Sequence, residues 1–162
     1  MSMNLLFVNR FMTRYQQIAL FLLRVSLGWL YFYAGISKVM NPEWSAAGFL
    51  KGAKTFAPFY QAMLHPSVLP FVDFLNEWGL TLLGVSLLIG CLVRVSTYAG
   101  AALMALYYLP ILDFPYPNSH AFLVDEHIIY IAALVVLVAF DAGRIWGVDG
   151  WLANRHKMTK SP

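Results

Sequence analysis

The sequence predicts an all-α fold, a polytopic membrane protein in which four transmembrane helices form a bundle and an amphipathic interfacial helix lies between the first two. Of the 162 residues, 60% are hydrophobic and only 12% are charged, whereas soluble domains carry about 25% charged residues. The mean hydropathy is +0.63. Apolar runs also recur at roughly the 20-residue length that a spanning helix needs. We therefore expect residues 1–162 to form a single integral membrane domain, surrounded by the lipid bilayer.

The four spans are predicted from apolar runs and the breaks between them. The first covers 16–39 and ends before Pro42, because proline disfavours helical geometry at the preceding residue. The second and third, 71–92 and 95–112, are separated by a short turn around Arg94. The fourth, 123–140, follows a proline-rich aromatic loop at 113–122. A basic tail at 142–162 completes the chain.

Residues 43–69 are predicted to hold the interfacial helix. Asn41-Pro42-Glu43 has the cap, proline and acid typical of a helix start. Apolar residues then recur at helical spacing, and Pro58 is expected to break the helix. An amphipathic segment of this kind is typical of the membrane surface.

The positions of the cations predict the topology. Four spans place both termini on one side of the membrane. That side carries most cations, namely Arg10, Arg14, Arg94, Arg144, Arg155, Lys157 and Lys160. The opposite side carries Lys38, Lys51 and Lys54. The positive-inside rule then predicts a plasma-membrane protein with both termini in the cytoplasm.

Composition and spacing also argue against several functions. A net charge of +3 is too small to indicate a nucleic-acid partner. Cys91 is the only cysteine, so neither an internal disulfide nor a Cys-x-x-Cys pair exists. His127 is the only histidine in a predicted span, which disfavours a bis-histidine haem. We expect no haem, flavin or metal on this chain.

Charged residues inside the spans indicate a polar site, because a charge in a spanning helix costs several kcal/mol unless it faces protein or water. On a helical wheel the first span has one stripe, about 80° wide, that holds both of its cations. Its members are Arg24, Gly28, Tyr31, Gly35 and Lys38. A complementary stripe on the second span holds Asp73, Glu77 and Gly84. These stripes predict that Glu77 is the first partner of Arg24.

The fourth span opens with Asp125, Glu126 and His127. In a helix the first and third of these side chains point about 160° apart. We therefore expect Glu126 and His127 to face inward and Asp125 to cap the helix. With the acids in the outer half of the membrane, the polar residues predict a pocket open to the outside, with Arg24 at its floor.

Simpler interpretations remain open for each of these residues. Arg24 and Glu77 would also serve as a structural ion pair between two helices. Lys38 would also reach the interface by snorkelling. Asp73 would also act as a helix cap. Tyr31 would also be a packing residue.

Several segments together resemble the DoxX/DoxD family over about residues 24–151. One is Arg-x3-Gly…Gly-x2-Lys on the first span. Another is Glu-x6-Gly-x5-Gly-x3-Arg, which here comprises Glu77, Gly84, Gly90 and Arg94. The third is an aspartate after a glycine-rich turn, Asp149. The resemblance implies a four-helix membrane bundle, and some of these relatives are the membrane subunit of thiosulfate:quinone oxidoreductase.

The function implied is a quinone-linked redox subunit that oxidises thiosulfate or a related sulfur compound. We expect a partner subunit, either in the membrane or soluble, and we also expect that the chain forms homo-oligomers. Arg24, Lys38, Tyr31 and Asp73 would bind substrate. Glu77 with His127 or Glu126 would relay protons. The alternative is a non-enzymatic structural or assembly subunit of a respiratory or stress-response complex. An anion carrier is a weaker interpretation, because no inverted repeat is visible.

Overall fold

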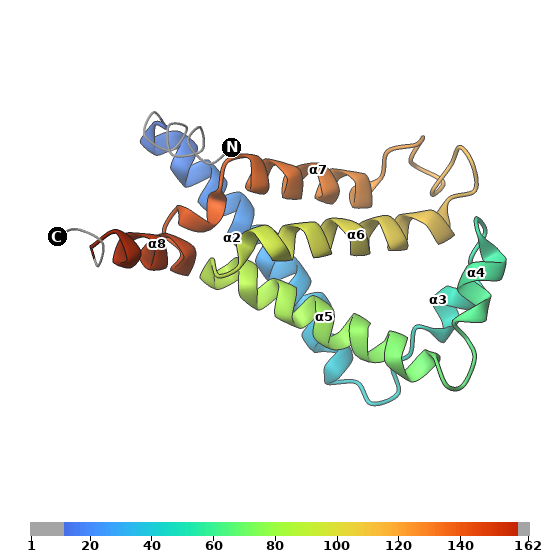
Figure 1. The fold of residues 1–162 in the computed structure, drawn as a ribbon. Coiled ribbons are helices and arrows are strands. Elements are labelled where there is room, and N and C mark those ends of the chain that lie inside the picture. Colours follow the sequence, from blue (N-terminus) through green and yellow to red (C-terminus); the bar gives the residue numbers. More distant parts are fainter. Residues whose placement is uncertain (1–11, 159–162) are drawn as a thin grey trace.

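The computed structural model describes residues 12–158 and is helical throughout (Figure 1). Seven α-helices and one 3₁₀ helix occur in these residues, without a strand. They are α2 (Arg14–Val39), α3 (Ala47–Lys51), α4 (Ala57–Ala62), α5 (Leu69–Ile89), α6 (Val93–Ile111), α7 (Glu126–Ala139), η1 (Ala142–Arg144) and α8 (Val148–Met158). The prediction of an all-α protein is confirmed.

The predicted spans correspond to four of these helices. The segments 16–39, 71–92, 95–112 and 123–140 overlap α2, α5, α6 and α7, with ends that differ by at most three residues. Among the described helices, α2 and α5 are long and apolar enough to cross a membrane. The apolar helix α7 has 14 residues. The described residues therefore include two helices whose length and apolar composition suit a membrane span.

Helices α2 and α5 pack closely along much of their length. Small residues allow this approach, as they do between helices in membranes. A Cβ built on Gly35 would lie 2.3 Å from the Thr81 backbone nitrogen. A Cβ on Gly84 would lie 2.2 Å from the Phe32 backbone nitrogen. The glycine-bearing stripes predicted on the two spans are thus the surfaces at which the two backbones meet.

Helices α6 and α7 form a second pair and lie side by side (Figure 1). The main hydrophobic core joins both pairs, and its largest fully buried members are Tyr31, Leu80, Leu87, Leu134 and Leu137. From their connection at 90–92, α5 and α6 diverge toward the end of the molecule that holds α3 and α4 (Figure 1).

The segment between the first two spans is not the single helix predicted from Asn41. It forms two short helices, and the backbone between them turns at Phe56, where φ is +55°. Pro58 lies in the first turn of α4, where proline is well tolerated, and so begins a helix where we expected it to end one. The segment has its own small core of Ala46, Leu50, Ala53 and Tyr60. These contacts fix two short helices, which a periodicity of apolar residues alone does not distinguish from one.

Candidate functional site

A cavity of about 520 Å³ lies where α5 and α6 diverge. Helices α3 and α4, the end of α2 and the start of α7 complete its wall. Most of its lining is apolar, with Ala46, Phe49, Leu50, Met63, Val72, Leu75, Leu103 and Leu106. The polar side chains in the lining are Lys38, Ser45, Tyr60, Asn76, Tyr107 and His127. An apolar cavity with a few convergent polar groups is typical of a small-molecule site.

Lys38 extends into this cavity from the last turn of α2. Its Nζ lies 5.0 Å from the centre of the Trp44 ring and 5.9 Å from that of Tyr107. Aromatic faces attract a cation without accepting conventional hydrogen bonds from it. The charge of Glu77 on α5 also acts on Lys38. The ammonium is therefore held in place while its N–H groups stay available to a ligand.

Tyr107 and Asn76, which also line the cavity, form a polar contact between α6 and α5. The Tyr107 hydroxyl donates a hydrogen bond to the Asn76 side-chain oxygen. The Asn76 amide nitrogen donates to the Val72 carbonyl at 2.9 Å. The Tyr107 ring meets Phe49 and His127 edge-on, with centroids 5.9 and 6.3 Å apart. These contacts fix the side chains of one wall before any ligand enters.

His127 is paired with Asp125 at the start of α7. Its Nδ1 lies 2.8 Å from Asp125 Oδ2, and Asp125 is only 5% exposed. Asp125 also accepts hydrogen bonds from the backbone N–H groups of His127 and Ile128, so the predicted cap is confirmed. The prediction that Glu126 faces inward is wrong, because this residue is exposed. The 160° argument applies only within a helix, whereas Asp125 has extended backbone geometry (φ −119°) and folds back over the first turn.

Hydrogen bonds of Asp73 and Tyr60 join the segment of the short helices α3 and α4 to α5 and α6. Asp73 accepts hydrogen bonds from the Ala46 backbone N–H at 2.8 Å and from the Ser45 hydroxyl at 3.0 Å. It does not cap its own helix. The Tyr60 hydroxyl donates to the Leu106 carbonyl at 2.9 Å, and burial raises the pKa of this phenol above its ordinary value.

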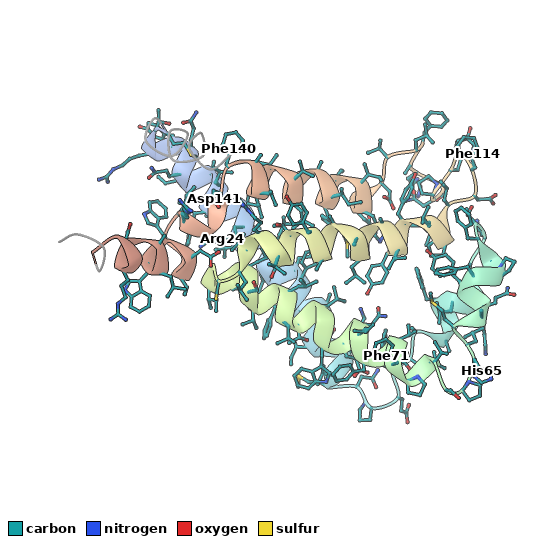
Figure 2. The ribbon with its side chains drawn as sticks, in the orientation of Figure 1. Arg24, His65, Phe71, Phe114, Phe140 and Asp141 are labelled. Carbon is teal, nitrogen blue, oxygen red and sulfur yellow. The ribbon has the colours of Figure 1, made fainter. Side chains whose placement is uncertain are left out.

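Arg24 is not at this cavity, and its expected pairing with Glu77 is wrong. The side chain is 0% exposed and lies against η1 at the other end of the bundle (Figure 2). One guanidinium nitrogen donates to the carbonyls of Ala142 at 2.6 Å and Ile145 at 2.9 Å. Fourteen residues, about 21 Å along a helix, separate Arg24 from Lys38. Charge matching between side chains could not identify backbone carbonyls as its partners.

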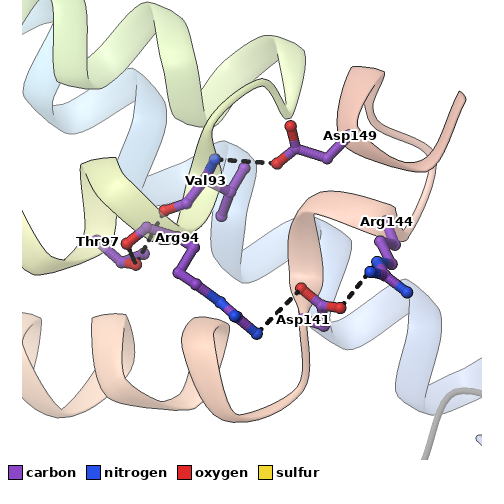
Figure 3. Close-up of polar contacts among 6 residues, drawn as sticks. All are labelled: Val93, Arg94, Thr97, Asp141, Arg144 and Asp149. Carbon is purple, nitrogen blue, oxygen red and sulfur yellow. Dashed lines mark hydrogen bonds and ion pairs between the residues drawn. The ribbon is translucent and has the colours of Figure 1, made fainter. Parts of the chain in front are cut away.

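Further polar contacts join the same end of the bundle (Figure 3). Asp149 accepts hydrogen bonds from the backbone N–H groups of Leu92 at 2.8 Å and Val93 at 3.0 Å, which caps α6. Asp141 forms ion pairs with Arg94 at 3.9 Å and Arg144 at 2.9 Å. We name this region the Arg24 junction, comprising Arg24, Gly90–Arg94 and 141–149.

The Arg24 junction depends on close backbone approach. Gly90 has a φ of +71°, and a Cβ there would lie 2.6 Å from Gly147 Cα and 2.8 Å from the Arg24 guanidinium. Gly90, Arg94 and Asp149 of the sequence motifs therefore gather at one structural junction, away from the cavity.

Tyr31 also lies outside the cavity lining. It is 1% exposed in the main core, and its hydroxyl has no hydrogen-bond partner among residues 12–158. The predicted substrate-binding set is thus divided. Lys38 lines the cavity, Asp73 supports its wall, and Arg24 and Tyr31 lie elsewhere. Of the residues predicted to relay protons, His127 lines the cavity and Glu77 does not.

Three residues of the site were not predicted from the sequence. Asn76 lies between Asp73 and Glu77, so the polar cluster at the start of the second span was the available signal. Trp44 and Tyr107 resembled interface aromatics, because their cation contact is visible only in three dimensions. Within the described residues, no group of three histidine, cysteine or acidic side chains could hold a metal ion.

Comparison with known families gave one match. A family model described as DoxX matches residues 19–111, which run from α2 to the end of α6. The match includes Lys38 and most of the cavity wall, but ends before His127. Neither curated proteins nor solved structures gave a match.

Proposed function

Because the chain belongs to the DoxX family, we propose that it is a membrane subunit of a quinone-linked redox system and binds the quinone headgroup in the cavity beside Lys38. The observation that carries this proposal is an apolar cavity whose lining, among the described residues, holds one cation, Lys38, and one histidine, His127.

A quinone matches these groups in shape and chemistry. Its ring is flat and apolar, and its two carbonyl oxygens accept hydrogen bonds. The Lys38 ammonium is a donor for one oxygen, and the His127 ring is placed to exchange a proton with the other. Phe49 and Tyr107 supply aromatic surface for the ring. Reduction takes up two electrons and two protons, so a proton-exchanging side chain at the site is required.

The cavity rim favours a ligand carried by the bilayer. Phe49, Leu75 and Leu106 line the cavity and are nonetheless 40%, 46% and 44% exposed. In a membrane these side chains contact lipid tails. A long isoprenoid tail would leave between α5 and α6 without crossing a polar rim.

The membrane arrangement belongs to the same proposal. Helices α2, α5, α6 and α7 would all cross the bilayer, with both termini in the cytoplasm and the cavity in the outer half. In support, α6 has 19 residues, about 29 Å, and packs along α7. The cations Arg94 and Arg144 lie at the Arg24 junction, on the proposed cytoplasmic side. Arg10, Lys160 and the side chain of Lys157 lie outside the described residues.

We place the electron donor on a partner subunit. Two thiosulfate ions that join through a new S–S bond release two electrons, which balances the reduction of one quinone. The thiosulfate dianion is poorly matched to this cavity. Among the described residues Lys38 is the one cation in the cavity lining, and the negative charge of Glu77 opposes an anion there. The sulfur compound would therefore react at the partner, and the cavity would hold the quinone.

Substitution of Lys38 tests the proposal. Trp44 lines the cavity, so a decyl-substituted benzoquinone should quench tryptophan fluorescence of the purified chain. A hydrogen bond from a charged group contributes about 1.5–3 kcal/mol, so Lys38→Met should weaken binding on the order of 10- to 100-fold. Lys51→Met, at an exposed position on α3, should bind as the unmodified protein does. Equal affinity in all three proteins would contradict the proposal.

The Arg24 junction favours a second candidate, a structural subunit of a membrane complex. Its buried arginine joins α2 to the segment around η1 and does not line the cavity. In that case Lys38→Met would alter assembly or thermal stability, and the unmodified protein would not bind the quinone at all. The same titration therefore separates the two candidates.

A further inference from the structure

We propose that Asp125 is a positioning residue that holds the His127 ring with its proton on Nδ1 and its Nε2 free for the ligand, so that His127 exchanges the proton that a bound quinone gains or loses. This inference rests on the proposed function for its ligand. Its structural part, the tautomer of one histidine, can be measured without any ligand.

The contacts of Asp125 determine which nitrogen carries the proton. Oδ1 accepts from the backbone N–H groups of His127 at 3.0 Å and Ile128 at 3.4 Å. Oδ2 lies 2.8 Å from His127 Nδ1. An ionised carboxylate only accepts hydrogen bonds, so Nδ1 must be the donor. In neutral imidazole the other nitrogen, Nε2, then carries the lone pair.

The surroundings of the ring leave that nitrogen available. His127 lines the cavity, and no hydrogen bond from residues 12–158 reaches Nε2. The titratable groups that line the cavity with this ring come from three other helices. They are Tyr107 of α6, in edge contact with the ring, Tyr60 of α4 and Lys38 of α2. The charge of Glu77 on α5 acts on Lys38. On α7 itself Glu126 is exposed.

The proton step follows from this arrangement. When the quinone receives two electrons from the sulfur compound of the partner, protonated His127 transfers the Nε2 proton to one carbonyl oxygen. An O–H bond forms and the N–H bond breaks. The neutral ring keeps the proton on Nδ1, which stays hydrogen-bonded to Asp125, and Nε2 regains a proton from water. Water also supplies the second proton of the quinol. Quinol oxidation follows the same path in reverse.

The experiment uses Asp125→Asn, because asparagine is as good a helix N-cap as aspartate. The cap of α7 is kept and the charge is lost. In nitrogen-15 NMR spectra of the histidine-labelled full chain, neutral His127 should be the Nδ1–H tautomer in the unmodified protein. In Asp125→Asn the amide NH₂ group can donate to Nδ1, so the Nε2–H tautomer should gain population. His127→Gln assigns the signal.

Kinetics give the second measurement. General acid–base catalysis contributes on the order of 100-fold or more, so Asp125→Asn should lower kcat for quinone reduction by about tenfold or more with little change in KM. Asp113→Asn is the matched control, because Asp113 is exposed and pairs only with Lys54, at 3.1 Å. It should leave both constants and the tautomer unchanged.

Each outcome bears on a distinct claim. A predominant Nε2–H tautomer in the unmodified protein, or an unchanged tautomer in Asp125→Asn, would overturn the role of Asp125. An unchanged kcat in Asp125→Asn would overturn the role of the pair in proton exchange. Absence of quinone binding in the fluorescence titration would instead remove the proposed function and leave the tautomer result standing.

Discussion

At the scale of single residues, Arg24 shows how a buried charge can be stabilised by backbone groups. A guanidinium has five N–H donors and no acceptor, and its bonds here go to the carbonyls of Ala142, which begins η1, and Ile145, which follows it. The charge of Asp149 also acts on it. Arg24 therefore fixes the fold of residues 142–149 against α2, and removal of its donors leaves buried carbonyls without partners.

Arg24→Met should lower the free energy of unfolding by about 3 kcal/mol or more, because each hydrogen bond from a charged group contributes about 1.5–3 kcal/mol. Arg14→Met is the matched control, since Arg14 is exposed on the same helix, and it should have little effect. Thermal unfolding of both variants in detergent measures the difference. Similar unfolding temperatures for the two would contradict the structural role assigned to Arg24.

At the scale of helices, the contact between α2 and α5 is set by backbone-to-backbone approach. Gly84 leaves no room for a side chain against Phe32, whereas a Cβ on Gly79 of the same helix meets nothing within 4 Å. The two glycines have the same intrinsic effect on the helix, so a comparison between them isolates the packing.

Gly84→Ala should therefore destabilise the protein, because a contact of 2.2 Å with backbone atoms forces the helices apart, at a typical overpacking cost of about 1–3 kcal/mol. Gly79→Ala should be neutral or stabilising by up to about 1 kcal/mol, from the higher helix propensity of alanine. Urea or thermal unfolding measures both. Equal stability of the two variants would show that the helices do not approach as closely as described.

At the scale of the whole molecule, the bundle has two unlike ends. The Arg24 junction ties α2, α6 and the last helix together with buried polar contacts. At the other end α5 and α6 are apart, and the short helices α3 and α4 close the space between them around the cavity. Polar contacts to backbone groups are thus concentrated at one end of the bundle and the cavity lies at the other.

Labelling with a membrane-impermeant maleimide tests how these ends face the membrane. Cys91, in the connection between α5 and α6, should react only after the cells are permeabilised. Ser119→Cys, placed in a Cys91→Ser background in the loop before α7, should react in intact cells. The opposite pattern would invert the topology. Reaction of both residues from outside would contradict four spans.

The sequence was most informative about helices and least about partners. Apolar runs and Pro42 located α2, α5, α6 and α7, because the length and hydrophobicity of a spanning helix are physical requirements. The cap at Asp125 was also predictable. The partners of Arg24 were not, since every residue has a carbonyl and only the fold selects one. The site around Lys38 was predicted in part, but its Trp44 and Tyr107 contacts depend on how two distant segments pack.

Arg24 and its hydrogen-bond acceptors lie far apart in the sequence, and this separation affects how the chain folds during synthesis. Arg24 and the carbonyl of Ala142 are 118 residues apart. At about 5–20 residues per second, the ribosome delivers the acceptor some 6–24 s after the arginine. During that interval α2 holds a charge whose final partners do not yet exist. The charge must remain in water, at the interface or against the translocon until the last segment arrives. Synthesis of residues 142–145, rather than insertion of α2, is therefore the event that supplies Arg24 with its partners.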